Sequence, residues 1–161
     1  MNLRIRQADF ADPRDANGIV TVLNSYAVDL MGSGKPLPHD VRERLVATLR
    51  DHPTTLVLLA FADDVPIGIA VCFVGLSTFR ARPLLNIHDL AVLPPYRGKG
   101  VGRALLRAAE EHARQMGCCR LTLEVLDGNS RARALYRSFG FDDPVVEAST
   151  VSRFLAKQLE A

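Results

Sequence analysis

A glycine-rich segment between two regular elements constrains the fold of this chain more than any other feature. The segment 97–102 (RGKGVG) follows an apolar, β-rich run that ends at Pro94–Pro95, and a run with helical periodicity follows it. Glycine allows tight backbone turns and leaves room for amide N–H groups to approach an anion. The N-terminus of the following helix adds unpaired N–H donors and the positive end of a dipole. The segment therefore predicts a phosphate-binding loop, and Arg97, Lys99 and Arg103 place positive charge around it.

Two familiar phosphate-binding patterns do not fit this loop. The dinucleotide pattern G-x-G-x-x-G ends on Arg103 when counted from Gly98, and on Leu105 when counted from Gly100. The P-loop pattern needs serine or threonine after its lysine, but Gly100 follows Lys99. What remains is either a pyrophosphate loop of another type or a glycine loop without a ligand.

Composition favours a single soluble domain spanning residues 1–161. The chain has 161 residues, of which 48% are hydrophobic and 24% charged. Its net charge of +2 is dispersed, and without a run of lysines or arginines we expect neither a nucleic-acid nor a membrane partner. The N-terminus MNLRIRQADF lacks the apolar core of a signal peptide, and no apolar run reaches the ~20 residues of a membrane span. A cytoplasmic location is therefore predicted.

The three cysteines, Cys72, Cys118 and Cys119, are expected to be reduced thiols. Their spacing does not suggest zinc, and we expect no metal. Cys72 lies in an expected core strand and the other two follow an expected helix end, so none has a basic partner that would activate it. The sequence thus offers no cysteine nucleophile.

Apolar periodicity predicts elements in the order β-α-α-β-β-β-α-β-α-β. Strands are expected at 3–6, 55–62, 65–74, 84–92 and 121–126, and the β-rich tail 145–159 is expected to hold at least one more. Helices are expected at about 13–28, 41–49, 100–116 and 129–139, with caps from Asp12, from His39 or Asp40, and from Asn129. A hairpin followed by a β-α-β-α half indicates an α/β (α+β) architecture, a mixed sheet with helices on both faces.

A second motif lies downstream of the glycine loop, Asn129-x-x-Ala132-x-x-x-Tyr136-x-x-x-Gly140-Phe141. Together with Arg97-x-x-Gly100-x-Gly102, it resembles the signature of the GNAT superfamily of N-acetyltransferases. The strand Ile87–Val92 is similar to the central strand of that family. The resemblance covers residues 3–141 and is specific from about residue 84 onward.

The resemblance implies a mixed, centrally splayed β-sheet that holds acetyl-CoA, as co-substrate, between the central strand and the next one. In the family the asparagine contacts the pantetheine arm, and the tyrosine lies near the thioester sulfur, where it protonates the departing thiolate. Helical spacing brings Asn129, Arg133 and Tyr136 to one side of their helix. The implied cofactor-binding residues are Leu90, Ala91, Val92, Arg97, Gly98, Lys99, Gly100, Val101, Gly102, Arg103, Asn129, Arg133 and Tyr136.

Transfer to an amine requires a base for the amine proton and an acid for the leaving thiolate. His88 is the first candidate for the base, directly or through water, because its intrinsic pKa lies near neutrality. In a regular pleat Asp89 points to the opposite face, although a bulge would reverse which of the two faces the substrate. Glu124 is the reserve base and Tyr136 the expected acid. A structural role, as a hydrogen-bonded histidine or a packed aromatic, remains the alternative for His88 and Tyr136.

The acceptor is expected to be a primary amine of a small molecule, acetylated directly in a ternary complex. The stretch 77–90 is similar to the spermidine/spermine and thialysine acetyltransferase branch, which has Glu-Asp where this chain has His88–Asp89. The loops 31–39 and 77–83 and the tail after residue 141 are expected to form the acceptor pocket. Among its substrate-binding candidates, Arg80 and Arg82 would hold a substrate carboxylate. Alternatively, three acidic residues would attract a polycation: Asp29, Asp89 and Glu124.

Two other functions remain open from the sequence. Transfer to a peptide or protein amine would require a wide groove in place of a closed pocket. A catalytically weak acyl-CoA-binding module would bind the cofactor and tolerate Tyr136→Phe. The apolar residues of 150–159 would suit either a homodimer or burial of that edge within one chain.

Overall fold

The computed structural model describes residues 1–142 and 154–159, and its centre is a five-stranded mixed sheet with strand order β1-β2-β3-β4-β5. The first four strands are antiparallel neighbours, and β5 pairs parallel to β4. The strands are β1 (Leu3–Gln7), β2 (Thr55–Ala62), β3 (Val65–Ser77), β4 (Arg82–Val92) and β5 (Leu121–Leu123). The helices are α1 (Pro13–Val28), α2 (His39–Asp51), α3 (Val101–Gln115) and α4 (Ser130–Phe139), with a 3₁₀ turn at Pro94–Tyr96.

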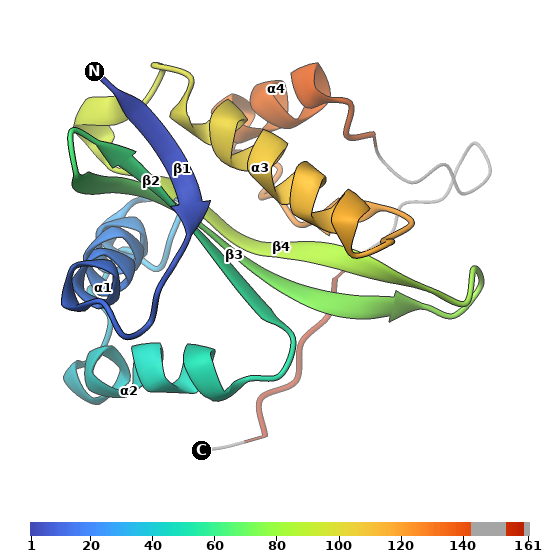
Figure 1. Ribbon diagram of the computed structural model, residues 1–161, viewed down its shortest axis with the longest axis horizontal. Coiled ribbons are helices and arrows are strands. Elements are labelled where there is room, and N and C mark those ends of the chain that lie inside the picture. Colours follow the sequence, from blue (N-terminus) through green and yellow to red (C-terminus); the bar gives the residue numbers. More distant parts are fainter. Residues whose placement is uncertain (143–153, 160–161) are drawn as a thin grey trace.

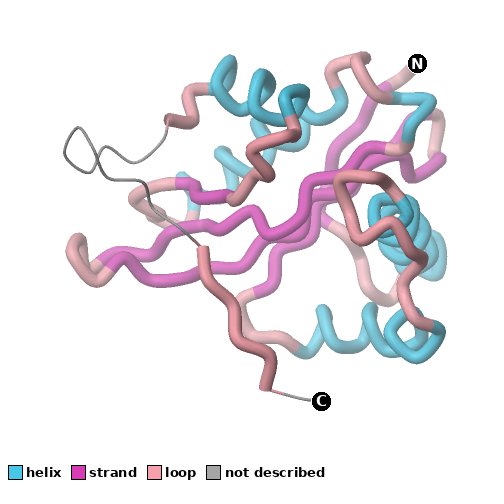
Figure 2. The backbone as a smooth tube through the Cα atoms, turned by 180° about the vertical axis from the view of Figure 1, so that it is seen from behind, coloured by secondary structure: helices cyan, strands magenta, loops and turns pink. Residues whose placement is uncertain are grey.

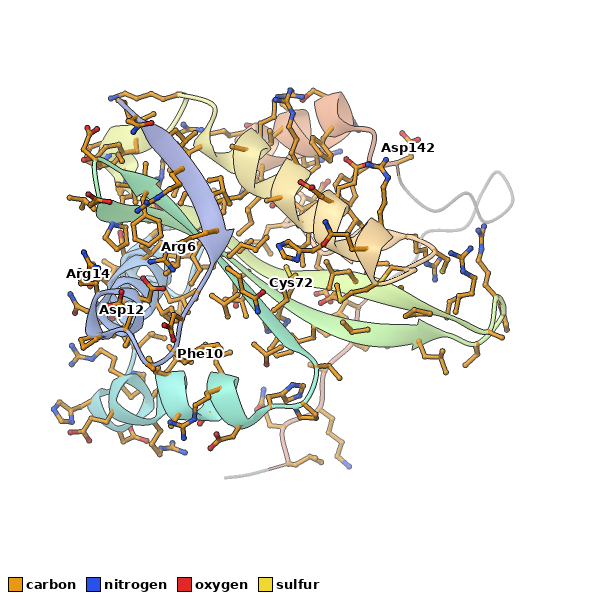
Figure 3. The ribbon with its side chains drawn as sticks, viewed as in Figure 1. Arg6, Phe10, Asp12, Arg14, Cys72 and Asp142 are labelled. Carbon is orange, nitrogen blue, oxygen red and sulfur yellow. The ribbon has the colours of Figure 1, made fainter. Side chains whose placement is uncertain are left out.

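Helices cover both faces of the sheet, as the sequence predicts. Figure 1 shows α3 and α4 on one side of the strands and α1 and α2 on the other, and Figure 2 shows the same layers from behind. Each layer has its own apolar core: Leu105 and Leu106 of α3 pack on one face, and Ile19 and Val22 of α1 pack on the other. Cys72 belongs to the core beneath α3 (Figure 3).

A buried ion pair fixes α1 against the first strand. Asp15 is fully buried, and both of its oxygens accept hydrogen bonds from the Arg6 guanidinium of β1. Asp12 caps the helix by accepting from the Arg14 N–H at 2.8 Å, as predicted, and Figure 3 shows Arg6 close to this end of α1. Because a bidentate pair of this kind is geometrically specific, it sets where the far end of α1 lies.

The β3–β4 hairpin is longer than the sequence suggests. Ser77 pairs with Arg82, so the predicted loop 77–83 is reduced to a tight turn in which Ala81 has φ of 49°. The Arg82 guanidinium donates to the Gly117 carbonyl at 3.0 Å, which attaches the hairpin to the end of α3. This long-range bond has no local signature in the sequence.

The sheet splays between β4 and β5, as the resemblance implied. Pairing between these strands is confined to three residues of each, Leu85–Ile87 against Leu121–Leu123. The prediction that β5 continues to residue 126 is wrong, because the strands separate and leave the residues after Leu123 without a ladder partner. Among the described residues, His88–Val92 therefore have no strand on this side.

Two local predictions need correction. The N-cap of α2 is Pro38, which makes no side-chain cap, and His39 is already helical; the Asp40 carboxylate instead accepts from Arg44 at 2.9 Å. No strand forms at 154–159, and the rest of the predicted tail strand, residues 145–153, lies outside the described residues. Within the described part of the chain, no helix has the length and apolarity needed to cross a membrane.

Candidate active site

A cavity of about 570 Å³ lies where β4 and β5 separate. Its walls come from the free edge of β4, the glycine loop with the start of α3, the end of α1 and the first turns of α4. The lining residues are Tyr26, Asp29, Met31, Leu90, Ala91, Val92, Tyr96, Arg97, Gly98, Gly100, Val101, Gly102, Arg103, Gly128, Asn129, Ser130, Arg131, Ala132, Leu135 and Tyr136. The fold thus brings the two sequence motifs to opposite walls of one cavity.

The glycine loop has the backbone geometry that its sequence requires. Gly98 and Gly100 have φ of 75° and 83°, in the left-handed region that favours glycine. Gly100 is also the N-cap of α3 and provides no side-chain cap, and the first helical hydrogen bond runs from the Ala104 N–H to the Gly100 carbonyl. The N–H groups of 101–103 thus precede the helical ladder, at the positive end of the α3 dipole. This is a suitable arrangement for an anion.

Arg97 is engaged within the protein. Its Nε donates to the Val92 carbonyl at 2.9 Å, and its Nη2 lies 2.8 Å from Asp29 Oδ2. Asp29 also accepts the Met31 N–H at 3.0 Å, and together the Met31 N–H and Arg97 hold the pKa of Asp29 below its usual range. Arg97 therefore joins three walls of the cavity: the end of β4, the glycine loop and the turn after α1.

The other predicted cations near the loop also have partners. The Arg103 guanidinium donates to the Ser138 hydroxyl of α4. The Lys99 ammonium lies 5.6 Å from the centre of the Tyr96 ring, and Lys99 does not line the cavity. These contacts tie the loop to its neighbours.

Tyr136 lines the cavity from α4, with its ring edge-on to Phe141 at 5.8 Å between centroids. Burial, with a smaller contribution from Tyr26, raises the pKa of Tyr136 to about 12. The hydroxyl is therefore protonated at neutral pH and able to donate. Asn129 lines the cavity and caps α4, since its Oδ1 accepts from the Ala132 N–H at 3.1 Å.

A β-bulge in β4 changes the roles open to His88 and Asp89. The register passes from Cys72↔Ile87 to Val71↔Asp89, so His88 is the extra residue. His88 is exposed, and its ring packs against Phe73 at 5.6 Å between centroids. Burial raises the pKa of Asp89, opposed by the charge of His88. The bulge thus separates an exposed imidazole from a half-buried carboxyl.

Tyr26 of α1 connects Asp89 electrostatically with the cavity. Burial raises the pKa of Tyr26, and the negative charges of Asp89 and Asp29 raise it further. Its hydroxyl donates to the Met31 carbonyl at 3.4 Å, and its ring lines the cavity. Two tyrosines with raised pKa values, Tyr26 and Tyr136, therefore line the same space from opposite layers.

Several residues singled out from the sequence lie away from the cavity lining. Arg80 and Arg82 are at the hairpin tip, and the ten residues from Arg82 to Ala91 span roughly 30 Å of strand. Glu124 is exposed just after β5. The Arg133 guanidinium binds Asp127, with 2.9 Å to its Oδ1. His88, Asp89 and Lys99 also do not line the cavity.

Sequence reasoning missed Tyr26 and Arg131 as lining residues, named Asp29 only as a charge that would attract a polycation, and gave Met31 no role of its own. Tyr26 and Asp29 sit together at the end of α1, and Met31 opens the loop that was expected to border the acceptor pocket. Arg131 is two residues after the capping asparagine. Among the described residues, no cluster of histidine, cysteine or acidic side chains could hold a metal ion.

Comparisons with known proteins cover most of the chain. The model of the family described as Acetyltransferase (GNAT) family matches residues 19–141. YhfO of Bacillus subtilis (strain 168), an uncharacterized N-acetyltransferase, is 31% identical over 147 residues, which are 88% of this chain and 91% of that protein. Thialysine N-epsilon-acetyltransferase of Bos taurus is 36% identical over 77 residues, and this match spans 48% of the chain and less than half, 45%, of that relative. A metagenomic aminoglycoside acetyltransferase, solved with sisomicin, shares the fold at TM-score 0.75 and 18% identity over 97% of both chains.

Proposed function

Since the chain belongs to the acetyltransferase (GNAT) family, we propose that it transfers an acetyl group from acetyl-CoA to a primary amine of a small molecule. The observation that carries this proposal is the cavity itself, in which the free edge of β4 faces Tyr136 and the glycine loop lies at one end. Such a cavity would bring a thioester, a phosphate anion site and a proton donor together.

The residues around the cavity fit acetyl-CoA. The left-handed glycines and the uncapped start of α3 offer N–H groups to a pyrophosphate. The unpaired edge from Leu90 to Val92 offers backbone groups to the amides of a pantetheine arm, as an added strand would. Asn129 lines the cavity, which supports its proposed contact with the same arm. The cofactor would supply an activated acetyl thioester at the Tyr136 end.

The reaction forms an N–C bond to the acetyl carbon, breaks the C–S bond and moves one proton from the amine to the departing sulfur. Tyr136 is the proposed donor to the sulfur, because its hydroxyl stays protonated well above neutral pH. The proposed acceptor of the amine proton is Asp89, because burial brings its pKa closer to neutrality and Tyr26 extends from its vicinity to the cavity. His88, exposed in the bulge, is the alternative base through water.

A small acceptor is favoured by how the end of α1 meets the cavity. Tyr26, Asp29 and Met31 form its wall opposite α4, and the Asp29–Arg97 ion pair holds that wall to the glycine loop. The two tyrosines, Tyr26 and Tyr136, offer aromatic surface to a cationic amine. The partial similarity to a thialysine acetyltransferase supports an acceptor of this size.

The test is acetyl-CoA turnover measured by thiol release. Polyamines, thialysine and other amino acids, aminoglycosides and short peptides would be offered as acceptors, with wild type beside Tyr136→Phe. We expect turnover with one small-amine class, lowered about 10²–10⁴-fold in kcat by Tyr136→Phe while acetyl-CoA binding by calorimetry persists. Tyr136→Phe keeps the ring against Phe141, so a structural role alone would leave kcat unchanged.

The same experiment separates the other functions. Turnover with peptides alone would replace the small acceptor by a protein amine. Tight binding without turnover, unaffected by Tyr136→Phe, would favour an acyl-CoA-binding module. No binding of any acyl-CoA would refute the proposal.

A further inference from the structure

Three arginines line the cavity, Arg97, Arg103 and Arg131, and two of them are engaged by the protein. Arg97 is held by the Val92 carbonyl and by Asp29, whose carboxylate offsets its charge. Arg103 is held by Ser138. The guanidinium N–H groups of Arg97 and Arg103 already have hydrogen-bond acceptors. An incoming anion would bind them more weakly, because it would first have to break those contacts. Arg97 and Arg103, which the sequence assigns to the loop, thus mainly form contacts within the protein.

Arg131 differs from these two arginines. It comes from the first turn of α4, and within residues 1–142 and 154–159 it makes no hydrogen bond or ion pair. Its Nη2 lies 3.6 Å from the point where a Cβ on Gly98 would be. The guanidinium therefore lies directly beside the glycine loop, in space that any side chain at Gly98 would enter.

The two helix starts add to the field at this point. The uncapped N-terminus of α3 begins three residues after Gly98, and Arg131 is the second residue of α4. Both dipoles present their positive ends. Arg131 is exposed to solvent, and a phosphate there would accept hydrogen bonds from its guanidinium and from the loop amides and would lie at the positive ends of both dipoles.

We infer that Arg131, supplied by α4, is the side-chain cation that binds the pyrophosphate of acyl-CoA, and that Arg97 braces the cavity through Asp29. This inference rests on the proposed use of acetyl-CoA. According to this inference, the positive side chain that binds the pyrophosphate belongs to the second sequence motif and not to the glycine loop. Arg131 is also the specificity residue between acyl-CoA and short acyl thioesters that lack phosphates, because those ligands give its guanidinium no partner.

The experiment is calorimetric binding of three probes, CoA, dephospho-CoA and pantetheine, to Arg131→Gln. Arg137→Gln is the matched control, because it removes the same charge from the same helix outside the cavity lining. We expect Arg131→Gln to weaken CoA and dephospho-CoA by the same factor, about tenfold or 1.4 kcal/mol, because both carry the pyrophosphate. Pantetheine binding is expected to stay unchanged, and Arg131→Lys to recover part of the loss.

Other outcomes would overturn the inference. A loss for CoA alone would assign Arg131 to the 3′-phosphate, and an equal loss for pantetheine would make it a structural residue. If Arg131→Gln and Arg137→Gln bound CoA with the same affinity, Arg131 would not be part of the phosphate site. The proposed function would still stand in that case, provided that wild type bound CoA. Wild type that bound neither CoA nor dephospho-CoA would refute the proposed function, and the inference with it. Thermal unfolding of each variant shows whether the fold is retained.

Discussion

The two halves of β4 have similar apolar sequences but different surroundings. From Leu85 to Ile87 the strand lies between two neighbours, β3 and β5, and Leu85 is fully buried. From His88 to Val92 it keeps β3 but loses β5, and Leu90 is only half-buried beside the cavity. Backbone groups on an unpaired edge can bind another extended chain. The same strand is therefore structural in its first half and open to a ligand in its second.

The contrast shows how a sheet makes a site without a dedicated binding loop. Separation of two parallel strands leaves a wedge with backbone donors and acceptors on one side. At the end of this edge, Arg97 donates a hydrogen bond to the Val92 carbonyl, so that carbonyl is already paired within the protein. In the proposed function, the glycine loop and Tyr136 would add an anion site and an acid to the wedge between β4 and β5.

The largest expected effect comes from making the same truncation in each half. Leu85→Ala should cost about 2–5 kcal/mol of unfolding free energy, because it empties a fully buried position. Leu90→Ala should cost less, about 1 kcal/mol, because that side chain is already partly exposed, and it should raise the KM for acetyl-CoA. Urea unfolding and steady-state kinetics measure the two quantities.

This pair of variants tests the comparison directly. If Leu85→Ala raised the KM for acetyl-CoA as much as Leu90→Ala does, the halves would not differ in role. If both lost the same stability, the greater burial of Leu85 would have no energetic meaning. Equal denaturant m-values would show that neither variant changes the extent of unfolding.

Local signals made part of this arrangement predictable. The glycine loop needs left-handed backbone at Gly98 and Gly100, and few other residues adopt it, so the sequence indicates the turn directly. Asn129 likewise caps its helix through a bond to a residue three positions on. The resemblance to an acetyltransferase family rested on these two segments, and the match to that family confirms it.

The rest depends on contacts between distant segments. The end of β5 is set by where β4 diverges from it, and the bulge at His88 by the register against β3. Neither leaves a periodic pattern in one strand. The Asp29–Arg97 pair joins positions far apart in sequence, so Arg97 read alone resembled an unpaired phosphate ligand.

A smaller change in unfolding free energy, and of opposite sign, is expected at Asp89, near the start of the unpaired half of β4. Burial raises the pKa of Asp89 above its ordinary value of 3.8, so the folded state disfavours the carboxylate. A raised pKa contributes stability below the unfolded value and loses it as the pH rises through the folded value. Asp89→Asn does not titrate, so it should be more stable than wild type at neutral pH. The two should converge below about pH 4.

The kcat of Asp89→Asn provides a second test. Asp89→Asn should lower kcat if Asp89 takes the amine proton, so stability and turnover should move in opposite directions. His88→Gln is the control, since the exposed imidazole contributes little to stability. A large loss of kcat in His88→Gln with little change in Asp89→Asn would move the base to the histidine. Chemical denaturation across pH and kcat profiles supply both measurements.

The smallest effect is expected at the point where the strands separate. Asn86 Nδ2 donates to Thr122 Oγ1 at 3.1 Å, one residue before the last paired position, and its second contact is the Thr122 carbonyl at 3.4 Å. Thr122→Val removes the first bond and keeps the second, so it should cost no more than about 1 kcal/mol, partly offset by the strand preference of valine. Because the wedge is set by the bulge and the end of β5, we expect an unchanged KM for acetyl-CoA. A raised KM at unchanged Tm would instead make this side-chain bond the element that fixes the width of the wedge.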